Sequence, residues 1–514
     1  MKFCLIRPAE SITPHSASCN KPMIPMGIAY LASSLEKFGH DIQIVDAVGL
    51  APTNYTRFDD RIYLLGLSED QVVERIDKDV EAIGVSIMFS YNWPPTRKLL
   101  RSLKTRFPDT PLVIGGEIAT SLTSIILSES PVDIVAKGEG EETIVELAKV
   151  LHLPDRNDRL GDIEGIVYRK GNQIIENPRR QRIKDIDALP YPAWDLFDIE
   201  AYSVNRFENG LRTEDAQAVI PMLATRGCPY SCTFCTSPDM WTTRYYTRDP
   251  ASVVDEIEYN VKRFGAKNFP FHDLTAIIQE EWIIEFCNEL IDRKLNISWQ
   301  LPSGTRSEAI NDKVAKLLSE SGMLQMGYAP ESGSEEIRKH IKKKVKRDSL
   351  IRSVRSAISN NIKVQVFFIV GFPNETRKQV WETHKMVATM AWLGVNDVGM
   401  NHYMALPGTE QILKEVDPQW VADLGDNFYF IPLFGHTLVM EDWRKVNRIM
   451  STFELTLHVL FGFSVFYIIL FVRHPSNLWR LISGMFSQND SSRIQVAIKT
   501  MLRHRSNISN FSNS

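Results

Sequence analysis

The sequence has 514 residues, of which 44% are hydrophobic and 24% charged, a balance that predicts a globular chain of two or three domains and excludes a fibrous or wholly disordered one. The formal net charge of -4 is small for this length. Without a basic excess, we expect no nucleic-acid partner.

Residues 1–151 alternate short apolar runs with helical patterns. Strands are expected at 3–6, 42–45, 82–88, 112–114 and 134–136, and helices at 27–38, 70–79, 95–107, 121–129 and 141–151. This alternation predicts an α/β domain with a Rossmann-like, doubly wound parallel sheet that binds its ligand at the carboxyl ends of its strands. The first apolar run stops at Pro8, which is too early for a signal peptide and fits a first strand.

Glycines follow the expected strands of this domain, and one serine lies near the end of the strand expected at 82–88. They are Ser86, Gly115, Gly116, Gly138 and Gly140. Glycine lets a backbone approach a bulky ligand closely, so this set marks a candidate binding edge. No G-x-G-x-x-G sequence opens a helix here, and a nicotinamide dinucleotide is therefore not expected.

Residues 152–215 are interpreted as a linker. A polar stretch is followed by a hairpin pattern with strands at 165–169 and 173–176, and then by a proline-aromatic segment at 189–195.

Residues 216–415 resume the alternation of strands and helices. Strands are expected at 218–224, 268–272, 297–301, 324–328, 364–370 and 397–403, and helices at 250–264, 280–293, 311–321, 335–342, 347–360 and 377–393. These six units suit a barrel whose active site lies at the carboxyl ends of its strands.

Half of the six cysteines fall in one loop after the strand expected at 218–224, at Cys228, Cys232 and Cys235. Three thiolates this close can bind one soft-metal centre and leave a coordination position open for a substrate or cofactor. A structural zinc site or a disulfide cluster is the alternative. The few remaining cysteines favour a reducing compartment, and we expect a cytoplasmic protein.

The pattern Cys228-x3-Cys232-x2-Cys235, with Phe234 before the last cysteine, resembles the signature of the radical S-adenosylmethionine (SAM) enzymes. The resemblance implies a partial (β/α)6 barrel, a [4Fe-4S] cluster on the three cysteines and SAM on the fourth iron. It also implies SAM-binding roles for residues at the strand ends: Asp273 near the methionyl amine, Arg306 after the third strand, Glu331 and Ser332 for the ribose and carboxylate, and Gly371 and Glu375 beside the adenine. The basic run at 342–347 is interpreted as a solvated helix end without a role.

The first domain resembles the cobalamin-binding domain that precedes the radical SAM domain in a large subfamily. The resemblance rests on residues 24–32, on Gly115 and Gly116, and on 138–141, and it implies that the binding edge contacts cobalamin. Many relatives continue the double glycine with a small residue and then a histidine, where this chain has Glu117 and Ile118, and no D-x-H-x-x-G sequence supplies a lower cobalt ligand. A domain that no longer binds cobalamin is the alternative.

Residues 416–514 are expected to form a helical cap with a disordered tail. Helices are predicted at 417–425 and 441–458, and the apolar run at 459–472 has the length of a buried or interfacial helix. Basic residues lead acidic ones in the tail, so peripheral contact with an acidic membrane surface is one expectation. Packing on the barrel or on a dimer partner is the alternative. The Ser/Asn-rich residues 506–514 have the composition of a disordered end.

The combined resemblance implies an enzyme that cleaves SAM to a 5′-deoxyadenosyl radical and, with cobalamin, transfers a methyl group to an unactivated carbon of a small biosynthetic substrate. It needs an external one-electron reductant such as flavodoxin or ferredoxin. Cyclisation or rearrangement without methyl transfer is the alternative within the same class, and a non-catalytic corrinoid or iron-sulfur sensor is the alternative outside it. A methylthiotransferase is disfavoured, because only Cys4 and Cys19 lie upstream of the loop.

Overall fold

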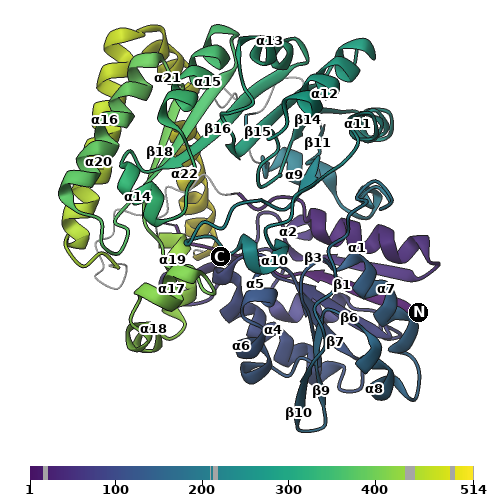
Figure 1. The fold of residues 1–514 in the computed structure, drawn as a ribbon. Coiled ribbons are helices and arrows are strands. Elements are labelled where there is room, and N and C mark those ends of the chain that lie inside the picture. The colour runs from purple at the N-terminus through teal and green to yellow at the C-terminus, as the bar shows by residue number, and fades with distance from the viewer. Residues whose placement is uncertain (15–20, 209, 212–217, 435–445, 487–491, 513–514) are drawn as a thin grey trace.

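The computed structural model describes residues 1–14, 21–208, 210–211, 218–434, 446–486 and 492–512. In the view of Figure 1 the first domain lies below the barrel domain, and the C-terminal helices run along the outer side of the barrel and back toward the first domain.

The first domain is built on a sheet with the strand order β10-β9-β8-β7-β6-β1-β3. Its strands are β1 (Lys2–Arg7), β3 (Asp41–Asp46), β6 (Ala82–Ser86), β7 (Leu112–Gly115), β8 (Ile134–Ala136), β9 (Ile166–Lys170) and β10 (Gln173–Glu176). Strands β3, β1, β6, β7 and β8 are parallel, which confirms the doubly wound fold. Apolar clusters cover both faces of the sheet.

The helices of this domain are α1 (Met26–Lys37), α2 (Ala47–Leu50), α3 (Glu69–Arg75), α4 (Trp93–Arg106), α5 (Glu117–Ser121), α6 (Thr123–Glu129), α7 (Glu141–Val150), α8 (Arg156–Arg159) and α9 (Ile199–Val204). The expected hairpin is present, but it lies in the first sheet, because β9 pairs antiparallel with β8. A small sheet of β2 (Glu10–Ile12), β5 (Tyr63–Leu65) and β4 (Tyr55–Arg57) was not predicted, since three-residue strands show no periodicity.

The barrel domain is an open parallel sheet with the order β11-β14-β15-β16-β17-β18. Its strands are β11 (Ala218–Val219), β14 (Ala266–Pro270), β15 (Ser298–Thr305), β16 (Met323–Glu331), β17 (Lys363–Val370) and β18 (Asp397–His402). Its helices are α11 (Pro250–Phe264), α12 (Glu280–Asp292), α13 (Asp312–Glu320), α14 (Glu335–His340), α15 (Arg347–Ser359) and α16 (Arg377–Leu393). The partial barrel is therefore confirmed.

The first barrel strand is shorter than the expected 218–224. The pairing with β14 nevertheless continues past Pro221, because the amide of Met222 donates to the carbonyl oxygen of Pro270 over 3.0 Å and Met222 forms a parallel bridge with Phe271. The chain then enters β12 (Thr225–Arg226), which pairs antiparallel with β13 (Tyr246–Thr247), and α10 (Ser237–Trp241) lies between these two strands in the chain.

The C-terminal helices are α17 (Glu410–Glu415), α18 (Pro418–Leu424), α19 (Asn427–Phe434), α20 (Thr452–Arg473), α21 (Ser476–Phe486) and α22 (Arg493–Ser512). The helix expected at 441–458 is wrong over 446–451: α20 begins at Thr452, where the Ser451 hydroxyl accepts from the amide of Glu454. Residues 441–445 lie outside the described residues. The run at 459–472 is part of α20.

The disordered tail expected at 506–514 is wrong over 506–512, where α22 continues. Contacts with the first domain hold this helix: Arg503 donates to Asn205, and Tyr55 lies 3.0 Å from the imidazole of His504. Residues 513–514 lie outside the described residues.

Candidate functional site

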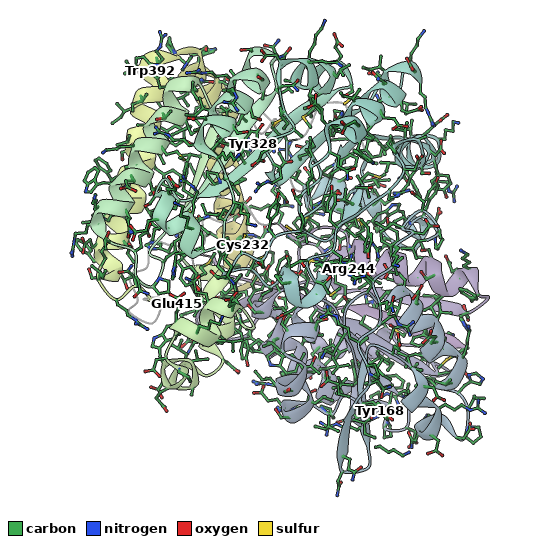
Figure 2. The ribbon with its side chains drawn as sticks, viewed as in Figure 1. Tyr168, Cys232, Arg244, Tyr328, Trp392 and Glu415 are labelled. Carbon is green, nitrogen blue, oxygen red and sulfur yellow. The ribbon has the colours of Figure 1, made fainter. Side chains whose placement is uncertain are left out.

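The three cysteines lie in the loop after β12, between the first domain and the barrel sheet. Figure 2 shows Cys232 in this central position. The turn into the loop requires Gly227, whose φ is 91° and where an added Cβ would lie 2.1 Å from the carbonyl oxygen of Arg244. The Cys235 thiol donates to the Ser237 hydroxyl over 3.2 Å.

A cavity opens beside Cys228 and Cys232 at the carboxyl ends of β15 and β16. It is lined by Cys228, Tyr230, Cys232, Leu274, Thr275, Gly304, Thr305, Arg306, Ser307, Tyr328, Ala329, Pro330, Lys343, Lys344, Val345 and Leu350. The Arg306 guanidinium lies 4.3 Å from the centre of the Tyr230 ring.

A positively charged and a negatively charged side chain pair at the wall of this cavity. The Lys343 ammonium donates to the carboxylate of Glu331 over 2.9 Å, and both side chains are largely buried. A zwitterionic amino-acid group needs a cation for its carboxylate and an anion for its ammonium. The side chains present therefore fit the methionyl part of SAM.

The thiols have the donor chemistry of an iron-sulfur centre. Burial raises the pKa of Cys232 to about 11 and also raises the pKa of Cys228 and Cys235, while the positive charge of Lys343 acts the other way on Cys228 and Cys232. Within the described residues, no three His, Cys, Asp or Glu side chains converge closely enough to hold a single metal ion. In a [4Fe-4S] cluster each of three cysteine thiolates binds a different iron, and the fourth iron stays open for SAM.

Buried ion pairs join the cysteine loop to the first domain. Arg226, two residues before Cys228, donates to Glu139 over 3.1 Å and to Glu141 over 2.7 Å. Glu139 also accepts from Arg182 over 2.6 Å. The sequence-based prediction used only the glycines of residues 138–141 and missed Glu139 and Glu141. Two acidic residues directly after a strand are a signal that could have indicated a bound cation.

A second contact joins the loop to the end of β7. Glu117 accepts a hydrogen bond from the hydroxyl of Thr236, the residue after Cys235, over 2.5 Å, and burial raises the pKa of the Glu117 carboxyl. Gly116 precedes it with a φ of 108°, and an added Cβ there would lie 2.2 Å from the carbonyl oxygen of Ile87. The position therefore requires glycine.

The structure brings most of the predicted cobalamin residues to one edge. Ser86 pairs in register with Gly115, and the amide of Gly138 donates to the Thr120 hydroxyl over 3.0 Å. Gly140 instead faces α1, because an added Cβ would lie 2.9 Å from Leu31.

Two apolar side chains at this edge are exposed. Met88 and Phe89, just after β6, are 56% and 41% exposed. Exposed apolar groups beside glycines and hydroxyls suit a flat, largely apolar macrocycle, so the residues present fit cobalamin.

Of the predicted SAM residues, Arg306 lines the cavity, and Glu331 lies behind its wall, paired with the lining residue Lys343. Asp273 does not line it: its carboxylate accepts from the amide of Ala224 over 3.2 Å and from the Thr225 hydroxyl, so it braces the backbone that leads to the cysteines. Burial raises the pKa of Asp273 to about 6.

Four other predicted residues contact neighbouring loops and helices. Ser332 lies 3.2 Å from the Thr383 hydroxyl of α16, and Glu375 accepts from the amide of Gly371 over 2.6 Å. Burial raises the pKa of Glu375 to about 7. The rings of Phe234 and Phe372 meet edge to face at 5.9 Å, so the cysteine loop packs on the segment that begins at Gly371. Their ligand-binding roles stay predictions.

Lys343 is the cavity residue that sequence reasoning missed. It belongs to the basic run at 342–347, which composition alone marks as solvated. The structure turns its side chain inward onto Glu331, while Lys342 pairs with the more exposed Glu410.

Two family models match the chain. The Radical SAM superfamily model matches residues 222–387 and the B12 binding domain model matches residues 16–148. The first range includes the cysteine loop, and the second includes the glycine-bearing edge described above.

The relatives include enzymes of two kinds. The chain is 27% identical over 394 residues to an uncharacterized methyltransferase of Pyrococcus horikoshii, covering 75% of this chain and 77% of that one. It is 30% identical over 370 residues to the anaerobic magnesium-protoporphyrin IX monomethyl ester cyclase of Rubrivivax gelatinosus, covering 70% and 61%.

The fold also matches a solved structure, the radical S-adenosylmethionine methyltransferase TsrM from Kitasatospora setae. The TM-score is 0.60 at 19% identity, covering 82% of this chain and 78% of that one. The cofactors of the chain are a [4Fe-4S] cluster, SAM and cobalamin. The chain belongs to the B12-binding radical SAM enzymes.

Proposed function

We propose that the protein is a cobalamin-dependent radical SAM methyltransferase that acts on an unactivated carbon of a small biosynthetic substrate. The observation that carries the proposal is that one loop contacts both cofactor regions. Cys228 and Cys232 line the barrel cavity, and Thr236 of the same loop donates to Glu117 at the cobalamin edge. The same loop would therefore contact SAM bound in the cavity and cobalamin bound at the edge.

When bound, the cluster supplies one electron that splits SAM into methionine and a 5′-deoxyadenosyl radical, and cobalamin carries a methyl group taken from a second SAM. The side chains of this chain bind and orient. Arg306 and Lys343 would hold the SAM carboxylate and Glu331 its ammonium, and Phe234 packs the loop against Phe372.

The lengths of the relatives support methyl transfer. The chain spans 77% of the methyltransferase of Pyrococcus horikoshii but 61% of the cyclase of Rubrivivax gelatinosus. Cyclisation without methyl transfer is the second candidate, because the cyclase has the higher identity of these two, 30%.

Product analysis separates the two candidates. Cobalamin-replete protein with its cluster, incubated with SAM, a reductant and candidate substrates, is expected to form both 5′-deoxyadenosine and S-adenosylhomocysteine. 5′-Deoxyadenosine without S-adenosylhomocysteine would favour cyclisation. If neither product forms, the alternative of a non-catalytic sensor is favoured.

The cysteine ligands have a matched control. Cys232→Ala is expected to lose iron and to form no 5′-deoxyadenosine, because the cluster loses a ligand. Cys287→Ala removes a buried thiol of α12 outside the site and is expected to keep both iron and activity. Full 5′-deoxyadenosine formation by Cys232→Ala would refute the cluster assignment.

We further infer a flavodoxin- or ferredoxin-like electron donor and contact with a lipid surface through the C-terminal helices. The donor follows from the one-electron chemistry. The lipid contact is supported by α20, which has the length and composition of a membrane span, a mean hydropathy of 2.3 and 33% of its most apolar window buried.

A further inference from the structure

The outward side of α20 is an apolar stripe that is interrupted by the exposed Ser464. Its exposed side chains are Phe453, Leu457, Leu460, Phe461, Ile468 and Val472, each between 41% and 81% exposed, and we name this set the outer face. Their spacing of mostly three to four residues places them on one side of the helix. No Asp, Glu, Lys or Arg occurs between Glu454 and Arg473.

The opposite side of α20 is fixed to the barrel. Leu455, Phe466 and Leu470 are buried in the apolar core of that domain, and the Tyr467 hydroxyl donates to Asp397 at the start of β18 over 2.8 Å. A helix of 22 residues is about 33 Å long, enough to cross a bilayer. Crossing would break these contacts and uncover the barrel core, so α20 is placed to lie along a surface.

The next helix extends the apolar surface. On α21, Leu478, Trp479 and Ile482 are 41%, 72% and 45% exposed. The charged residue of α21, Arg480, points inward and donates a hydrogen bond to the carbonyl oxygen of Asn396. An amphipathic helix of a water-soluble surface has the reverse arrangement, with apolar side chains inward.

Tryptophans and cations form the rim of this surface. Trp381 and Trp392 of α16 are 47% and 61% exposed, and Figure 2 shows Trp392 at the edge of the molecule. The Arg473 guanidinium lies 5.1 Å from the centre of the Trp392 ring, and Lys378 and Lys385 are exposed on α16. Tryptophan and long cationic side chains are the residues that sit at the headgroup level of a bilayer.

The charge of the rim favours one occupant. Glu454 is paired with Arg377, and Glu382 is the other acid on this side of α16, so the cations are in excess. Anionic lipid headgroups complement such a rim. A symmetric dimer through the same face would bring two cationic rims together.

We propose that the outer face docks the enzyme onto an anionic bilayer, with α20 parallel to the membrane plane and Trp381, Trp392 and Trp479 at the headgroup level. The proposal rests on the lipid contact inferred above and is independent of the methyl-transfer chemistry.

Co-sedimentation of the full chain with vesicles tests the proposal. Vesicles of phosphatidylcholine with phosphatidylserine are expected to bind the protein, and pure phosphatidylcholine or added salt to weaken binding. The double variant Leu460→Glu/Ile468→Glu is expected to lower the binding by about tenfold or more, since it replaces two apolar side chains that the bilayer would bury with charged ones.

Ile174→Glu is the matched control, because Ile174 is 53% exposed on β10, in the hairpin of the first domain, and should not alter binding. Unchanged thermal unfolding of all variants would show that they are folded.

Each result that contradicts the docking proposal overturns a different part of it. Equal binding to pure phosphatidylcholine overturns the anionic preference, and unaltered binding of the double variant overturns the outer face as the docking surface. A concentration-dependent dimer that the double variant abolishes assigns the face to a second copy. No binding to either vesicle removes the lipid contact altogether, while 5′-deoxyadenosine formation, measured separately, still tests the proposed chemistry.

Discussion

At the junction between the two domains, charged side chains are buried: those of Arg226 and Glu139 are each 3% exposed. On α20 the opposite holds, since Phe453 is 55% and Ile468 is 63% exposed. In ordinary globular proteins charged residues are rarely buried without a partner and large apolar patches are rarely exposed. The junction meets the first condition through ion pairs within the chain, whereas the side chains of the outer face stay largely exposed among the described residues, although Phe461 packs edge-on against Trp381. The comparison teaches that the buried carboxylates of the junction find their cations within the chain, whereas the outer face is the surface where we expect an external partner.

The largest effect is expected from a substitution that breaks the ion pairs of the junction. Arg226→Ala would leave the buried Glu141 without its cation, while Glu139 would keep Arg182, and the loss costs about 3–5 kcal/mol of unfolding free energy. The loop that carries Cys228 would also lose its anchor, so we expect a lower iron content. Denaturant unfolding and iron analysis measure the two effects.

A surface arginine is the control for this variant. Arg263→Ala removes an exposed pair with Asp195 and should leave stability and iron content unchanged. Wild-type stability and iron in Arg226→Ala would mean that the junction does not depend on its ion pairs.

The second effect compares two sides of one helix. Phe466 is fully buried and Phe453 is exposed, although both lie on α20. Phe466→Ala is expected to lower the unfolding free energy by about 3–4 kcal/mol through the cavity that it leaves. Phe453→Ala should change it by less than about 0.5 kcal/mol in the absence of lipid. Equal losses in thermal or denaturant unfolding would show that the outer face is already covered in solution.

The third effect is on ligand binding. Lys343→Met keeps the apolar stem but removes the cation beside Cys228, Cys232 and Glu331. Charge-assisted hydrogen bonds contribute about 1.5–3 kcal/mol, so the affinity for SAM should fall by about tenfold to a hundredfold in equilibrium dialysis. Lys339→Met, which removes an exposed pair with Glu335 on α14, is the control. Unchanged affinity of Lys343→Met would exclude Lys343 from the SAM site.

Local patterns predicted most of the fold. The alternation of strands and helices in residues 1–151 and 216–415 is a short-range signal, and the positions of Cys228, Cys232 and Cys235 follow from their own spacing. The end of a strand also marks the binding edge, because parallel strands present their carboxyl ends together.

Long-range contacts account for what sequence reasoning missed. Arg226 and Glu139 are 87 residues apart, so no local pattern pairs them. Lys343 looks solvated because its neighbours are basic, and only the fold turns it toward Glu331. The tail has the composition of a disordered segment, yet Arg503 and His504 tie α22 to distant residues of the chain.

The smallest expected effect concerns the attachment of α20 to α16. His384 of α16 and His458 of α20 lie 3.2 Å apart, with Trp381 edge-on to both rings. Burial, helped by the neighbouring imidazole, lowers the pKa of His384 to about 4. Burial also lowers the pKa of His458, with Glu454 acting against it and Arg377 with it.

Acid should therefore weaken the attachment of α20. A histidine whose pKa is lower folded than unfolded stabilises the fold above its unfolded pKa of 6.5, and that stability is lost as the pH falls toward 4. Between pH 7 and pH 6 the loss for His384 is at most about 0.7 kcal/mol. His384→Gln should flatten this pH dependence in denaturant unfolding, whereas Lys385→Gln on the same helix should preserve it. If the slope survives in His384→Gln, the imidazole pair does not control how α20, and with it the outer face, is held.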